Sequence, residues 1–225
     1  WHAAFILPGV ISLLIGIGLI WHIQSNQISL KNIVSGKFSE NPERSQYLKI
    51  AIIMLISITC LSFVFQILQT SLPKTMDIRL SASMDLSTSE IGYIVSAIYV
   101  VSGLMNYVGG ILADKYSEKI IYAIGIIGQG CLLLLIISLS NYWLIAICLI
   151  IVAFNSSILP AENLLLARFA PEKYQSLVYG IKFIISFSVG PVALILISKS
   201  YELTNEFSYL YLASGVIMLL LFLVV

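Results

Sequence analysis

The sequence predicts an all-α integral membrane protein, a polytopic helix bundle, and three observations carry the prediction. Apolar residues make up 59% of the 225 residues and charged residues only 10%, whereas a soluble domain carries about 25% charged residues. The mean hydropathy is +1.00. The apolar residues also gather in runs close to the ~20 residues that a helix needs to cross a bilayer. We therefore expect seven transmembrane helices, with bilayer lipid as their surroundings.

The seven runs are separated by polar segments of unequal length. The first run is followed by a long connector, residues 23–49, that is rich in Ser, Asn, Gln and charge, whereas short loops join the other six. This layout predicts one helix over residues 1–22, a central loop over 23–49, and a compact six-helix domain over 50–225. The runs cover residues 3–22, 50–72, 91–112, 119–139, 142–168, 176–198 and 207–225.

The distribution of Lys and Arg predicts the orientation. Loops on the cytoplasmic side of a membrane protein carry the excess of positive charge. One side of the predicted bundle holds only Lys74, Arg79 and Lys199. The other side, which we assign to the cytoplasm of a cell whose inner membrane holds the chain, has nine such residues: Lys31, Lys37, Arg44, Lys49, Lys115, Lys119, Arg168, Lys173 and Lys182.

The loop at residues 73–90 is then expected outside. It ends in Ser87-Thr88-Ser89-Glu90, the spacing of a capping box, in which a serine and a glutamate bond each other's backbone N–H. We expect this box to start the next helix.

Polar residues recur at helical spacing on four of the six helices, and on the other two they are sparse. This division predicts that four helices line half of a water-filled cavity while 119–139 and 207–225 support them from the lipid side. The alternative is that the polar stripes are helix–helix contacts, which also use small and polar residues. The candidates for the cavity wall are Gln66, Gln69, Tyr99, Asn106 and Asn155.

Glu162 is the outlier among the polar residues. It lies about seven residues before the cytoplasmic end of its helix, and Lys182 lies about as far inside the next one. At 1.5 Å per residue both are ~10 Å deep, so an ion pair is expected. A carboxylate inside the membrane is a functional candidate, here for coupling to protons. The alternatives are a pair that locks the cytoplasmic gate, and a Lys182 that only extends toward water.

Composition argues against several other functions. A net charge of +1 offers no basic patch for nucleic acid. His2 and His22 lie at the two ends of the first helix, which disfavours a His-based catalytic triad or metal site. The cysteines Cys60, Cys131 and Cys148 have no CxxC spacing and are expected to be small buried apolar residues. We expect no enzyme, no cofactor and no metal.

One short loop carries a resemblance to a known family. Gly110-x-Leu112-Ala113-Asp114-Lys115, followed by Lys119, resembles the cytoplasmic signature loop of the major facilitator superfamily, Gly-x-Leu-Ala-Asp-Arg/Lys-x-Gly-Arg-Arg/Lys. That motif lies between helices 2 and 3 and, in weaker form, between helices 8 and 9. Ser117 here replaces a Gly and Glu118 an Arg, as expected of the weaker copy.

Two further stretches fit the same register. Trp1-His2-x-x-Phe5 resembles the start of the family's helix 6, and Ala167 to Pro171 with Gly180 resembles its loop between helices 10 and 11, although Gln175-Ser176 replaces the usual Arg-Gly. The resemblance runs over the chain as helix 6 through helix 12. It implies the C-terminal six-helix half of the family's fold, with helices 7, 8, 10 and 11 around the cavity and helices 9 and 12 outside.

The resemblance implies a secondary transporter that works by alternating access on a small-molecule substrate, with protons as coupling ion. The chain opens on Trp1 rather than Met and stops inside an apolar run at Val225, so we expect a fragment whose partner is the N-terminal half of the same protein. The alternative is a membrane sensor or scaffold that keeps the fold without transport.

The resemblance also implies a role for the signature loop, carried by Gly110, Asp114, Lys115 and Lys119. Asp114 would approach the start of the helix near Tyr174 to Leu177, where the helix dipole favours a carboxylate. The two lysines would hold neighbouring cytoplasmic ends. These contacts would form when the cytoplasmic side closes and break when it opens.

Overall fold

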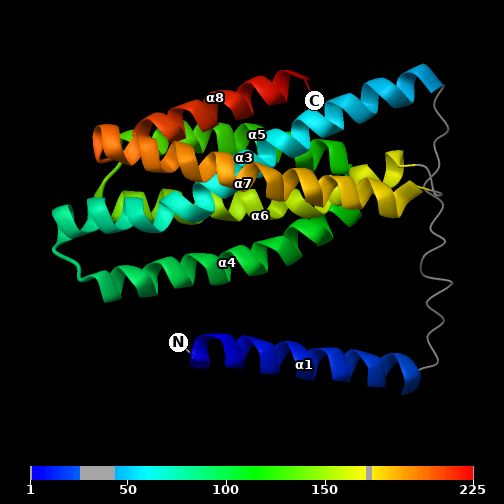
Figure 1. Cartoon of the computed structure of the whole chain (residues 1–225), viewed down its shortest axis with the longest axis horizontal. Coiled ribbons are helices and arrows are strands. Elements are labelled where there is room, and N and C mark those ends of the chain that lie inside the picture. Colours follow the sequence, from blue (N-terminus) through cyan, green and yellow to red (C-terminus); the bar gives the residue numbers. More distant parts are fainter. Residues whose placement is uncertain (1, 26–43, 171–173, 225) are drawn as a thin grey trace. The chain divides into compact units, whose positions relative to one another are not determined.

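The fold is that of a computed structural model, and it describes residues 2–25, 44–170 and 174–224. Seven α-helices and one 3-10 turn make up this part of the chain, in which no strand occurs (Figure 1). The chain divides into two units: the first holds α1 (His2–Ser25) and the second holds the other six helices. The predicted all-α bundle is confirmed. Most of the predicted central loop, residues 26–43, lies outside the described residues.

The second unit runs through its six helices in chain order. These are α3 (Arg44–Met84), α4 (Thr88–Lys115), α5 (Glu118–Leu135) with the 3-10 turn η1 (Ile136–Ser138), α6 (Asn141–Phe169), α7 (Gln175–Thr204) and α8 (Ser208–Val224). Five stretches of the described chain are long and apolar enough to cross a membrane, one in each of the helices α3 to α7, with η1 included in that of α5; α1 and α8 hold shorter apolar stretches, Pro8–His22 and Ser208–Val224.

The first helix of the second unit is longer than the sequence predicts. The apolar run 50–72 was expected to end in an outer loop, but α3 continues through Pro73 to Met84. Proline removes one backbone donor, which membrane helices tolerate. Leu72, Met76 and Leu80 follow at four-residue spacing and are fully buried, so packing of this face keeps the extension helical. The predicted 73–90 loop is wrong over most of its length.

The capping box that starts α4 is confirmed. The Ser87 hydroxyl accepts from the Glu90 backbone N–H at 3.4 Å, and the Glu90 carboxylate accepts from the Ser87 N–H at 2.9 Å. Two of the backbone donors that a helix start leaves unpaired are thereby satisfied. The box therefore fixes where the chain re-enters the bundle after α3.

The six helices pack in pairs (Figure 1). α4 lies along α6, α3 lies along α7, and α5 packs between α6 and α8. About 39% and 44% of the most apolar stretches of α5 and α6 are buried, against 17% for α4 and 11% for α7. α5 and α6 are thus central to this unit, whereas α4 and α7 leave most of their apolar surface uncovered.

A glycine explains how closely α4 approaches α6. A Cβ atom added to Gly109 would lie 2.6 Å from the carbonyl oxygen and 2.7 Å from the Cα of Ser157. Only glycine fits there, in line with the small residues that allow close helix crossings in membranes. A Cβ atom added to the neighbouring Gly110, which the sequence singles out, would have no atom within 4 Å. The hydroxyls of Ser102 and Ser156 bond across the same crossing.

Arg79 joins three segments at the end of the bundle opposite the α4–α5 connection. Its guanidinium donates to the carbonyl oxygens of Ile136 at 2.7 Å and Leu139 at 3.2 Å. It also donates to the Glu206 carboxylate at 3.1 Å and to the Ser208 hydroxyl at 3.0 Å. The sequence placed Arg79 in a loop; on α3 its guanidinium instead ties α3 to the η1 turn and to the start of α8.

Candidate functional site

A cavity of about 310 Å³ lies among α3, α4, α6 and α7. Its volume is at the lower end of the range for small-molecule sites, about 300–1,000 Å³. The described residues that line it come from those four helices and from neither α5 nor α8, which agrees with the division that polar spacing predicted. Its polar lining consists of Ser62, Gln66, Asn106, Asn155, Glu162, Asn163, Lys182 and Ser186.

Three of the five predicted wall residues come together in this cavity. Gln66 on α3, Asn106 on α4 and Asn155 on α6 line it, and each carboxamide carries both donors and an acceptor. Gln69 and Tyr99 lie outside this lining: the Tyr99 hydroxyl donates to the Gln69 backbone oxygen at 3.3 Å. That contact links α3 to α4.

The predicted ion pair between Glu162 and Lys182 is confirmed. The Glu162 carboxylate lies 2.5 Å from the Lys182 ammonium, and the two side chains are only 3% and 7% exposed. The ammonium also donates to the Asn163 side-chain oxygen at 2.6 Å. Lys182 therefore does not extend toward water, and the alternative of a snorkelling lysine is wrong. A charge at this depth is tolerated because its partner is at hydrogen-bond distance.

Two more contacts hold α7 to its neighbours around this pair. The Tyr179 hydroxyl donates to the Asn163 backbone oxygen at 2.8 Å, and the Ser62 hydroxyl donates to that of Ser186 at 2.7 Å. The first links α7 to α6 and the second links α3 to α7. Side-chain hydrogen bonds near the ion pair thus connect the helices that form the walls of the cavity.

Close packing holds the Gln66 side chain near α7. A Cβ added to the buried Gly190 would lie 3.2 Å from the Gln66 amide nitrogen, closer than most real Cβ contacts, so the missing side chain leaves room for the amide. Gly190 was not identified from the sequence; a glycine directly before Pro191 inside an apolar helix was the available signal.

The signature loop is a tight connection between α4 and α5. α4 ends at Lys115, and α5 begins at Glu118. Lys115 lies over the ring of Tyr116 at 5.9 Å from the ring centroid, and Lys119 over that of Phe169 at 5.4 Å. The second is a cation–π contact that ties α5 to the end of α6, in the distance range where such contacts stabilise.

Glu118, which replaces an Arg of the family pattern, has a positive partner. Its carboxylate forms an ion pair with Arg168 on α6, and the Glu118 side chain is only 10% exposed. The departure from the pattern is therefore compensated by a charge of the opposite sign. Arg168 and Glu118 were not paired by sequence reasoning, because they lie fifty positions apart along the chain.

The expected contact of Asp114 with the start of α7 is absent from this conformation. Asp114 is exposed, and none of the ion pairs among the described residues includes it. No Cα atom of α4 lies within 8 Å of one in α7 over the described ranges. α4 packs instead along α6, so its C-terminal carboxylate is left on an open surface. The loop residues 171–173 lie outside the described residues.

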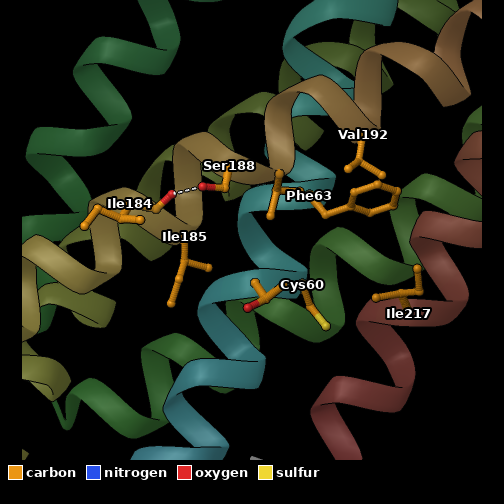
Figure 2. Close-up of a pocket in the computed structure, with 9 residues that line it drawn as sticks. Cys60, Phe63, Ile184, Ile185, Ser188, Val192 and Ile217 are labelled. Carbon is orange, nitrogen blue, oxygen red and sulfur yellow. Dashed lines mark hydrogen bonds between the residues drawn. The ribbon is translucent and has the colours of Figure 1, made fainter.

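A second cavity, of about 420 Å³, lies between α3, α7 and α8 and is apolar (Figure 2). Its two hydroxyls are turned back to their own helices: Thr59 donates to the Leu55 carbonyl at 2.8 Å and Ser188 to the Ile184 carbonyl at 2.7 Å. These hydroxyl protons are therefore not available to a ligand. The first cavity, with its carboxamides, is the candidate site.

The chain was also compared with known proteins. The family model described as Major Facilitator Superfamily matches residues 54–225, which covers α4 to α8 and most of α3. No curated protein matches the chain. The match includes the signature loop and every residue that lines the first cavity.

Proposed function

Because the chain belongs to the major facilitator superfamily, whose members are transporters, we propose that it carries a small solute across the membrane by alternating access coupled to protons. The chain is a multi-pass membrane protein of that transporter family rather than a member of an enzyme family. We assign it to the cell (inner) membrane, with the α4–α5 and α6–α7 connections on the cytoplasmic side.

One observation supports this function most: the four-helix cavity contains both carboxamides and a buried ion pair. In secondary transporters the substrate and coupling-ion sites lie near the middle of the membrane. Gln66, Asn106 and Asn155 are proposed to contact the solute. Glu162 is proposed to take up and release the coupling proton. Lys182 is proposed to hold the Glu162 side chain in place and to join α6 to α7 when the cytoplasmic side is closed.

The domain organisation is part of the proposal. We assign residues 1–22 to helix 6, residues 23–49 to the central cytoplasmic loop and residues 50–225 to the C-terminal six-helix domain. The apolar surfaces that α4 and α7 leave uncovered are proposed to face the N-terminal half of the same protein. In this family the two halves are repeats that rock about a site between them.

The test works without the identity of the solute. Cells that express the full-length protein are fed a uniformly ¹³C-labelled extract of small metabolites, and mass spectrometry measures how each solute distributes across the membrane. We expect at least one solute to differ from empty-vector cells, with the difference lost in Glu162→Gln. Glu202→Gln, on an exposed part of α7, is the matched control and retains the difference. Identical distributions with and without the protein would contradict transport.

A further inference from the structure

We propose that the solute of the four-helix cavity is uncharged, rich in hydrogen-bonding groups, and has an apolar face. The proposal rests on the transport function above and narrows it to a substrate class. It follows from which lining groups already have partners and which do not.

The charges of the cavity bind each other. Glu162 and Lys182 are the charged side chains among its described lining residues, and they lie 2.5 Å apart, both nearly fully buried. The ammonium also bonds Asn163. While Glu162 is ionised, as the ion pair requires, an anionic solute would have to displace Glu162 from Lys182, and a cationic solute would have to displace Lys182 from Glu162. Either exchange leaves one buried charge without its partner, which is strongly unfavourable.

Three carboxamides of the cavity, in contrast to its charges, have no hydrogen-bond partner among the described residues. Among the hydrogen bonds of the described residues, none uses the side-chain amide of Gln66, Asn106 or Asn155. The amide atoms of Gln66 and Asn155 are not sealed from solvent, and Asn106 is an exposed residue. Each offers two N–H donors and one acceptor oxygen. A hydroxyl or amide group, which both donates and accepts, matches such a wall better than a carboxylate that only accepts or an ammonium that only donates.

Aromatic rings share the apolar part of the wall with Leu61, Ile158 and Leu159. Phe65, Phe183 and Phe187 line the cavity, and the last two rings stack with centroids 6.3 Å apart. All three are exposed, Phe187 to 70%, so apolar ring surface is available to an apolar face of a ligand. Rings of this kind also attract cations, but the only carboxylate among the described lining residues is already paired with Lys182.

The test uses three probes that share one scaffold and differ in charge: para-nitrophenyl β-D-glucoside, which is neutral, the corresponding glucuronide, which is anionic, and the glucosaminide at a pH where its amine is protonated. Binding to the purified full-length protein is measured by the shift of its melting temperature and by calorimetry. We expect the glucoside to bind about tenfold or more tightly than either charged probe.

A matched pair of variants locates the binding. Gln66→Leu is expected to abolish the glucoside shift, and Gln69→Leu, one turn further along the same helix but outside the cavity lining, to retain it. Asn155→Leu replaces Gln66→Leu if that variant does not fold. Stronger binding of a charged probe, no binding of any probe, or equal losses in both glutamine variants would overturn the proposal.

Transport is scored separately in the labelled-extract experiment. Glucoside binding without solute redistribution would contradict the proposed transport function while leaving the substrate class standing. Redistribution of charged solutes alone would contradict the substrate class while leaving transport standing.

Discussion

The carboxylate of Glu162 on α6 and the ammonium of Lys182 on α7 lie 2.5 Å apart and are almost completely buried. They join two helices that otherwise share few contacts around the cavity. Each charge is tolerated at this depth because of the other. The pair can therefore act as a bond between α6 and α7 that depends on the charge of Glu162.

Removing one member of the pair should cost more than removing both. Lys182→Met leaves the Glu162 carboxylate without its cation, a change that typically destabilises by about 3–5 kcal/mol. Glu162→Gln combined with Lys182→Met leaves no charge behind and should recover most of this loss. Thermal unfolding of the purified variants measures both. Lys199→Met, an exposed lysine of the same helix, should be close to wild type. Equal melting temperatures for the single and double variants would contradict the account.

Gly109→Ala should destabilise the α4–α6 crossing. The added methyl group would lie 2.6 Å from a backbone oxygen of Ser157, and backbone cannot move aside as a side chain can. Overpacking of this kind typically costs about 1–3 kcal/mol. Gly110→Ala is the matched control, because that methyl group meets nothing within 4 Å and alanine favours a helix over glycine by up to about 1 kcal/mol. A lower melting temperature for Gly110→Ala than for Gly109→Ala would refute the close crossing.

Asp114→Asn should slow transport without weakening the fold. The carboxylate is exposed and makes no ion pair among the described residues, so its loss should leave the melting temperature unchanged. Its proposed role is a contact made only when the cytoplasmic side closes. Solute redistribution in cells measures the rate, and Asp85→Asn, an exposed aspartate at the opposite end with a φ of 57°, is the control because asparagine also adopts that backbone conformation. A wild-type transport rate for Asp114→Asn would contradict the proposed role of Asp114 in closing the cytoplasmic side.

The outer contact of Glu206 should weaken in acid. The Ser208 hydroxyl and, after it, Arg79 hold the pKa of Glu206 below its usual value of 4.5. Because the pKa of Glu206 is lower in the folded protein, the contact adds to the free energy of unfolding when the pH is above the usual glutamate pKa. This contribution is lost as the pH falls from the usual pKa through the pKa of the folded protein. Because Glu206 is 45% exposed, the contribution is that of a surface pair, about 0.2–1 kcal/mol.

Melting curves of wild type and Glu206→Gln against pH measure this effect. Wild type should melt higher near neutral pH. The difference should shrink as the pH falls below the usual glutamate pKa and vanish below the lowered pKa of the folded protein. A difference that grows as the pH falls would show the opposite sign and contradict the assignment.

The sequence predicts the helices, the cavity-lining helices and the ion pair, because each depends on local quantities. The length of each apolar run predicts a transmembrane helix, and the spacing of polar residues predicts which helix face lines the cavity. Equal depth on two antiparallel neighbouring helices places Glu162 beside Lys182. Periodicity identifies a face but does not show at which depth a cavity ends. Gln69 lies on the same polar face of α3 as Gln66, about one turn further along. Its backbone oxygen accepts a hydrogen bond from Tyr99, and the residue lies outside the cavity lining.

Other features depend on which helices are neighbours, and the order of segments in the chain does not determine that. The ion pair of Glu118 with Arg168 and the fit of Gly109 against Ser157 both arise from contacts of α6 with other helices. The expected approach of Asp114 to α7 assumed that α4 and α7 meet, and over the described residues they do not. The continuation of α3 to Met84 likewise depends on burial of Leu72, Met76 and Leu80 rather than on hydropathy.

The central claim is that the four-helix cavity opens to each side of the membrane in turn. The most direct measurement uses Asn155→Cys in a protein whose native Cys60, Cys131 and Cys148 are replaced by serine, with a membrane-impermeant maleimide added to sealed vesicles of either orientation. Alternating access predicts labelling of Asn155→Cys from both sides. Leu194→Cys, on an exposed apolar position of α7, should be labelled from neither side. Labelling of Asn155→Cys from one side only would contradict the claim.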